Sequence, residues 1–173
     1  MNTELNIPQH HIKVFDLGGV IINIQPEITF NAFTKYLDPQ ISAEQGMREM
    51  QQHFTDFEAG AISQQTLLAN FNAILSKKLS LNQFVEIWNF LLLDIPTKRL
   101  QTLLQLSKKE PIYLLSNTNS IHIEAINKYL KREFAINGLS ALFNACFLSY
   151  EMQQRKPDAN IYKSVQKTLN CTP

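Results

Sequence analysis

Three short apolar segments, separated by long helical stretches, constrain the fold of this chain most. They cover residues 12–15, 111–115 and 145–148, and each is short enough to be a buried strand. Strands that alternate with helical connections form βαβ units, which build a parallel sheet. The sequence therefore predicts an α/β fold with a parallel sheet.

The connection between the first two strands is far longer than a crossover needs. Residues 25–95 contain no convincing strand, and their apolar side chains recur at helical spacing, which is typical of packing surfaces. We expect an all-helical insertion over residues 25–95, placed over the carboxyl ends of the strands. Residues 1–24 and 96–173 would then form the α/β core.

Local signals divide this insertion into helices. Pro26 suits the first turn of a helix over about residues 27–37. Ser63 is placed to cap a later helix. Ser42–Gln45 and Ser80–Gln83 have the form of capping boxes, in which a serine and a glutamine satisfy each other's backbone donors. The insertion should therefore be a bundle of short helices.

Composition excludes several classes of function. The chain has 173 residues, a formal net charge of +1 and 18% charged residues, so nothing suggests binding to nucleic acid or to an anionic membrane surface. Its apolar runs are too short to span a bilayer. Cys146 and Cys171 do not have the spacing of zinc ligands. With the polar, signal-free start of the chain, they favour a cytoplasmic location.

Polar residues follow each predicted strand. Asp16 ends the first strand and is followed by Gly18-Gly19, Ser116-Asn117 end the second, and Lys156 lies in the loop after the third. Parallel strands bring these residues to one edge of the sheet. An acid, a hydroxyl with free N–H groups and an ammonium suit a phosphoryl group as nucleophile, donors and neutralising charge.

Each of these residues also has a structural interpretation. Asp16 and Asn117 could be turn residues, Ser116 could cap the following helix, and Lys156 could be a solvated surface charge. Taken singly, each structural interpretation stands. Their order along the chain, each at the end of a strand, favours a phosphoryl site.

The segments V-F-D-L-G-G-V, L-L-S-N-T-N and F-L-S-Y-E-M-x-x-R-K-P-D-A-x-I-Y resemble motifs I, II and III of the haloacid-dehalogenase (HAD) superfamily. Their combination is similar to the branch that includes bacterial glucose-1-phosphate phosphatase, and Phe57–Ser63 resembles a segment of that family's cap. The resemblance runs from about residue 11 to the end of the chain. It implies a Rossmann-like parallel sheet with helices on both faces and an all-helical cap inserted after the first strand.

The resemblance also implies a mechanism. Asp16 would attack phosphorus and form an aspartyl-phosphate intermediate, which water then hydrolyses. Ser116, Asn117 and Lys156 would hold the transferring group. The cofactor would be Mg²⁺, bound by the Asp16 carboxylate and the Gly18 carbonyl oxygen. The substrate would be a small, sugar-like phosphate monoester.

Two departures from the family pattern affect these expectations. Gly18 stands where the superfamily usually has the aspartate that acts as general acid and base, a group typically worth about 10²–10⁴-fold in rate. Its absence favours good leaving groups, such as anomeric phosphates, and leaves the acid unassigned. The family's fourth motif, which completes the magnesium site, does not occur before Pro173, so the activity of this chain is left open.

Two alternatives remain beside the phosphatase. A 2-haloacid dehalogenase uses the same aspartate without a metal, and a non-catalytic module would bind a partner through its helices or its sheet edge. Without a fourth-motif strand, residues 12–15 would form an exposed edge that carries one charge, Lys13. We therefore expect self-association through the first strand.

Overall fold

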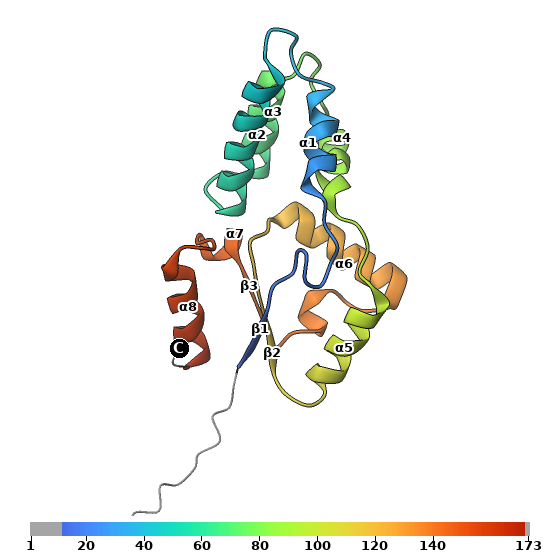
Figure 1. The fold of residues 1–173 in the computed structure, drawn as a ribbon, viewed down its shortest axis with the longest axis vertical. Helices are drawn as coiled ribbons and strands as arrows, with labels where there is room; N and C mark the ends of the chain where they lie inside the picture. Colours follow the sequence, from blue (N-terminus) through green and yellow to red (C-terminus); the bar gives the residue numbers. More distant parts are fainter. Residues whose placement is uncertain (1–11, 172–173) are drawn as a thin grey trace, which may run out of the picture.

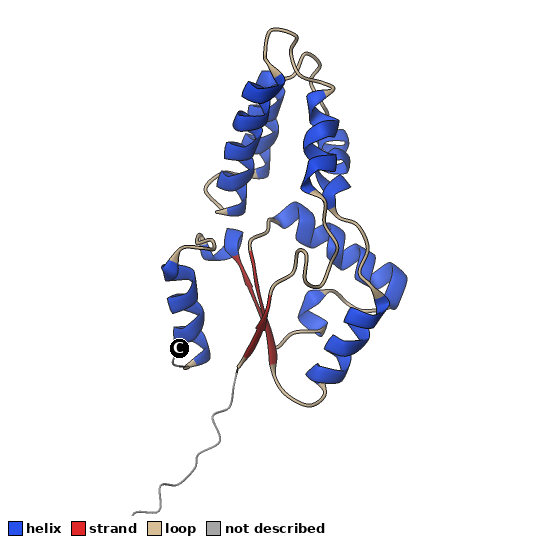
Figure 2. Cartoon of the chain, in the orientation of Figure 1, coloured by secondary structure: helices blue, strands red, loops and turns tan. Residues whose placement is uncertain are grey.

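A three-stranded parallel sheet lies at the centre of the fold (Figure 2), which we describe from a computed structural model over residues 12–171. The strands are β1 (Lys13–Phe15), β2 (Ile112–Ser116) and β3 (Ala145–Leu148), and they lie in the order β1-β2-β3. Both pairs are parallel, so the carboxyl ends of all three strands share one edge. The predicted parallel sheet is confirmed.

Helices cover both faces of this sheet (Figure 1). One face packs against α5 (Thr97–Ser107), α6 (Ser120–Phe134) and the 3₁₀ turn η2 (Leu139–Ala141), and the other packs against α8 (Ala159–Leu169). Successive side chains of a strand point to opposite faces, and β2 uses this alternation. Leu114 joins the cluster of α5 and α6, whereas Leu115 packs with Ile161 of α8.

A separate group of helices stands beyond the carboxyl ends of the strands (Figure 1). We call this group the helical region; it comprises α1 (Pro26–Thr34), α2 (Ala43–Glu58), α3 (Gln64–Ile74), α4 (Leu81–Trp88) and the 3₁₀ turn η1 (Asn89–Leu91). The predicted apolar stripes meet here in a core of their own, in which Phe33, Phe71, Phe84 and Trp88 are fully buried. Aromatic side chains contribute large buried areas, which stabilises this region around a cluster distinct from that of the sheet.

The start signals of these helices are largely confirmed. Ser63 caps α3, and Ser80 and Gln83 form a complete capping box at α4. Of the two hydrogen bonds of the capping box predicted at Ser42–Gln45, one forms and the other does not. The Ser42 hydroxyl accepts the Gln45 N–H, but the Gln45 side chain donates to Glu49 one turn further on. That partner is an (i, i+4) neighbour on the same helix face.

The sequence misplaced some boundaries. The helix expected over about residues 27–37 runs from Pro26 and ends at Thr34. The loop expected between the third strand and Lys156 begins with a helical turn, α7 (Ser149–Met152). The buried Ser149 hydroxyl fixes the start of that turn by bonding both Thr118 and Glu58, partners that lie far away in sequence.

Residues 1–11 and 172–173 lie outside the described range. The polar start of the chain and the two ends of the expected core fall on these residues, so their predictions are not addressed by the structure. Across the remainder of the chain, none of the helices combines the length and the apolar character needed to cross a membrane.

Candidate active site

The end of β1 and the loop after α7 bring Asp16 and Lys156 into direct contact. Lys156 Nζ lies 2.6 Å from Asp16 Oδ2, although the two residues belong to opposite ends of the chain. The Asp16 side chain is 44% exposed and that of Lys156 is 20% exposed, so the carboxylate remains accessible at the sheet edge. The other carboxylate oxygen, Oδ1, accepts the Leu17 N–H at 2.8 Å. The structure therefore brings Asp16, after the first strand, together with Lys156, from the loop predicted after the third strand.

Asn117 holds the loop that carries Lys156. Its side-chain Nδ2 donates to the Lys156 backbone carbonyl oxygen at 2.9 Å, and its side-chain Oδ1 accepts the Lys156 backbone N–H at 2.8 Å. Lys156 Nζ also donates to the Leu115 carbonyl oxygen at 3.2 Å. The Asn117 side chain therefore positions Lys156, a role that the sequence did not predict for it.

Ser116 ends β2 beside this pair. It is 2% exposed, and its hydroxyl donates to the Asn117 carbonyl oxygen at 3.3 Å. That bond is long and therefore weak, so a modest rotation would free the hydroxyl for another acceptor. The predicted residues at the ends of β1 and β2 and in the loop after β3 thus come together.

The chain turns sharply after Asp16. Gly19 has a φ of +75°, a conformation that glycine adopts without the strain of a Cβ. The turn is closed by the Gly19 N–H, which donates to the Ile22 carbonyl oxygen at 2.8 Å. A Cβ at Gly18 would lie 2.8 Å from the Ile24 side chain. The two glycines therefore allow the tight turn by which the chain passes from the end of β1 toward α1 in the helical region.

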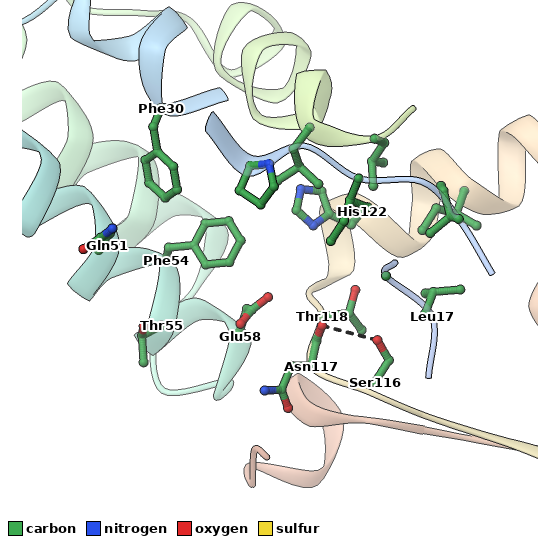
Figure 3. A pocket seen from close by; sticks show the side chains of 17 residues that line it. Leu17, Phe30, Gln51, Phe54, Thr55, Glu58, Ser116, Asn117, Thr118 and His122 are labelled. Carbon is green, nitrogen blue, oxygen red and sulfur yellow. Dashed lines mark hydrogen bonds between the residues drawn. The ribbon is translucent and has the colours of Figure 1, made fainter. Parts of the chain in front are cut away.

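A cavity of about 360 Å³ lies between the sheet edge and the helical region. Its floor includes Leu17, Gly18, Ser116 and Asn117, and its opposite wall is formed by side chains of α1 and α2 (Figure 3). Phe30 and Phe54 face the cavity, and the centroids of their rings are 5.9 Å apart. Apolar side chains form most of the remaining wall. Such a cavity is large enough for a small organic phosphate.

Two titratable groups line this cavity that sequence reasoning did not identify as functional. Glu58, the last residue of α2, points toward Thr118 in Figure 3 and is 8% exposed. Burial raises the pKa of its carboxyl, and the Arg155 guanidinium opposes this effect. His122 lies in the first turn of α6, and burial lowers its pKa to about 4. The only sequence signal for Glu58 was its place beside Phe57 in the cap-like segment.

The described residues offer few ligands for a metal. In residues 12–171, no three His, Cys, Asp or Glu side chains gather closely enough to hold a metal ion. At the sheet edge, Asp16 supplies one carboxylate, and the Gly18 backbone lies beside it in the cavity floor. This donor set fits Mg²⁺ only in its usual minimal form, in which one carboxylate is supplemented by substrate phosphate and water.

Comparisons with known proteins identify similar enzymes, although no family model matches the chain. D-ribitol-5-phosphate phosphatase from Bacteroides thetaiotaomicron is 25% identical over 162 residues, which cover 92% of this chain and 77% of that protein. A crystal structure of a HAD family enzyme from the same organism is 34% identical with a TM-score of 0.82, covering 94% of this chain and 80% of that chain.

A second structure of this same enzyme is a complex with magnesium and inorganic phosphate. It is 32% identical with a TM-score of 0.75, covering 93% of this chain and 80% of that chain. L-2-haloacid dehalogenase from Xanthobacter autotrophicus is 19% identical with a TM-score of 0.54, covering 94% of this chain and 67% of that chain. The last likeness concerns the fold alone.

Proposed function

Because the chain belongs to the HAD family of hydrolases, we propose that it hydrolyses a small, sugar-like phosphate monoester through an aspartyl-phosphate intermediate on Asp16. The name of the similar D-ribitol-5-phosphate phosphatase, and the magnesium and phosphate complex of the similar HAD family enzyme, support a magnesium-dependent phosphoric monoester hydrolase. The observation that carries the proposal is the contact between Asp16 and Lys156, next in the chain to Leu17 and Gly18, which line the cavity.

Each site residue has a chemical role in this proposal. Asp16 Oδ2 forms a bond to phosphorus as the bond from phosphorus to the ester oxygen breaks. Lys156 Nζ, which lies 2.6 Å from Asp16 Oδ2, neutralises charge on the phosphoryl oxygens. The Ser116 hydroxyl and the Asn117 backbone N–H donate to the same group. Asn117 also fixes the Lys156 loop through its side chain.

Magnesium fits beside these residues in a minimal site. The Asp16 carboxylate and the Gly18 carbonyl oxygen would hold it, and bound Mg²⁺ neutralises negative charge on the phosphoryl group. Gly18 supplies no carboxylate for proton transfer to the leaving oxygen. A substrate with a good leaving group, such as an anomeric phosphate, depends least on that proton.

We also propose that the helical region acts as a cap over the sheet edge. Its separate core and its contribution of Phe30, Phe54 and Glu58 to the cavity wall support this role. In this arrangement residues 25–95 form the cap, and residues 1–24 and 96–173 form the core. Closing a cap over the site would exclude water from the reacting group.

Location and association are further proposals. The free thiols of Cys146 and Cys171 are consistent with the reducing cytoplasm. Self-association through β1 is supported by its place at the end of the strand order and by the exposure of Val14, which is 41% exposed. An unpaired strand edge with apolar side chains recruits other strands.

An assay of phosphate esters and 2-haloacids, with and without Mg²⁺, tests the proposed function. We expect release of phosphate from sugar-like phosphates in the presence of Mg²⁺, and none from the Asp16→Asn variant at unchanged thermal stability. The amide is nearly isosteric with the carboxylate but is not an anionic nucleophile. Turnover of haloacids without metal, or phosphate release by Asp16→Asn at the parental rate, would refute the proposal.

A further inference from the structure

The end of α2 contacts the loop that carries Lys156. Glu58 Oε2 accepts a hydrogen bond from Arg155 Nη2 at 3.0 Å, and Arg155 directly precedes Lys156 in the chain. The Glu58 side chain is 10% exposed and that of Arg155 is 35% exposed. The pair is thus largely shielded from solvent, unlike the exposed ion pairs on the helix surfaces. Arg155 Nε is buried without a hydrogen-bond partner among residues 12–171, so the bond from Nη2 to Glu58 is the contact that orients the guanidinium.

A second contact fixes the backbone of Glu58. The Ser149 hydroxyl, which is fully buried, lies 2.6 Å from the Glu58 carbonyl oxygen and accepts the Thr118 N–H at 2.9 Å. Ser149 therefore links the end of α2 to the segment that follows β2. Gly60, two residues after Glu58, has a φ of +67°, and a Cβ at Gly60 would collide with the Tyr150 carbonyl oxygen. The end of α2 is therefore in close backbone contact with α7.

The loop around Lys156 is held from two sides. Asn117, at the end of β2, bonds both the N–H and the carbonyl group of Lys156. Glu58, at the end of α2, binds the preceding Arg155 side chain. One anchor belongs to the sheet and the other belongs to the helical region. The position of Lys156 against Asp16 therefore depends on how the helical region sits on the core.

We propose that Glu58 is a positioning residue that sets Lys156 against Asp16 through Arg155. It couples the docking of the helical region to the assembly of the phosphate site. Removing one member of a shielded ion pair leaves the other without a counter-charge, so the Arg155 side chain moves and Lys156 moves with it. The importance of this movement for phosphate rests on the proposed function, but the coupling itself does not.

The test uses the Glu58→Gln and Arg155→Gln variants and their double variant. Glu124→Gln is the matched control, because it removes a carboxylate from an exposed pair with Lys128 on α6. Orthovanadate affinity is measured by calorimetry, and the backbone amide of Lys156 is followed by NMR. We expect about tenfold weaker vanadate binding in each single variant, since small misplacements of a binding group are costly. The double variant should lose no more than either single variant.

The outcomes separate the two claims. A shifted Lys156 amide with weakened vanadate binding, in both single variants but not in Glu124→Gln, supports the positioning role. Parental affinity and an unmoved Lys156 amide in folded Glu58→Gln would overturn it. If the parent protein binds no vanadate, the proposed function fails, and the amide shift alone still decides the coupling. If Glu58→Gln does not fold, Arg155→Gln is judged by the same two criteria.

Discussion

Lowering the pH should destabilise the protein through His122. Its Nε2 lies 3.2 Å from the Trp88 carbonyl oxygen, which can only accept, so Nε2 carries the proton and donates it. Nδ1 is then free to accept from the Asn119 amide at 3.0 Å. A proton on Nδ1 would face that amide donor inside a site that is 4% exposed. The folded protein therefore keeps this imidazole neutral.

The magnitude follows from the lowered pKa. Burial lowers the pKa of His122 from 6.5 to about 4, which corresponds to about 3 kcal/mol of unfolding free energy. Between these values the unfolded chain binds more protons than the folded protein, so stability rises with pH. The contribution is present above pH 6.5 and is lost as the pH falls toward 4. The raised pKa of Glu58 acts in the opposite sense, since it favours folding at low pH.

Urea unfolding of the parent protein and of His122→Gln, measured from pH 7 to pH 4, isolates the histidine. Since Glu58 is present in both proteins, its contribution cancels in the comparison. We expect the parent to lose about 3 kcal/mol more than His122→Gln over this range. The control His53→Gln, in the half-buried middle of α2, should retain the steep dependence of the parent.

Equal losses of stability in the parent and in His122→Gln would refute the reasoning. That result would mean that the imidazole is protonated in the folded protein without cost. The contacts with Trp88 and Asn119 would then not hold it neutral.

Three other predictions concern the site and the sheet edge. Lys156→Ala should weaken vanadate binding by about 10- to 100-fold, the worth of a hydrogen bond to a charged group, whereas Lys128→Ala should not; equal affinities in calorimetry would contradict the role of Lys156. Mg²⁺ should bind with a Kd of about 1 mM or weaker without phosphate, because the described residues supply so few ligands, and more tightly with vanadate; micromolar binding of the metal alone would contradict this. Light scattering with gel filtration should show self-association of the parent protein, and Val14→Lys should suppress it, since Val14 is 41% exposed on β1. A parent protein that stays monomeric at high micromolar concentration would contradict this prediction.

The meeting of Asp16, Ser116, Asn117 and Lys156 could be predicted because a parallel sheet imposes it. Asp16 and Asn117 directly follow strands, Ser116 ends one, and Lys156 lies in the loop beyond the third. Parallel strands end at one edge of the sheet. The fold class depended on the same pattern. Neither inference needed knowledge of side-chain packing.

Glu58 and His122 could not be predicted in the same way. The Arg155 partner of Glu58 lies 97 residues away, and the Trp88 partner of His122 lies 34 residues away. Only the docking of the helical region on the core creates these contacts. Gln45 shows the same limit within one helix, because its side chain donates to Glu49 and does not bond the backbone of the N-cap residue Ser42. Local patterns specify elements, whereas tertiary contacts select partners.

Trapping of a covalent intermediate tests the central claim most directly. The protein would be mixed with a sugar-like phosphate ester and Mg²⁺, quenched in acid within one turnover, and mapped by peptide mass spectrometry. We expect a phosphoryl group on the peptide that contains Asp16, formed before phosphate is released, and none on that peptide in Asp16→Asn. Phosphate release without a labelled Asp16, or with the phosphoryl group on another residue, would contradict it.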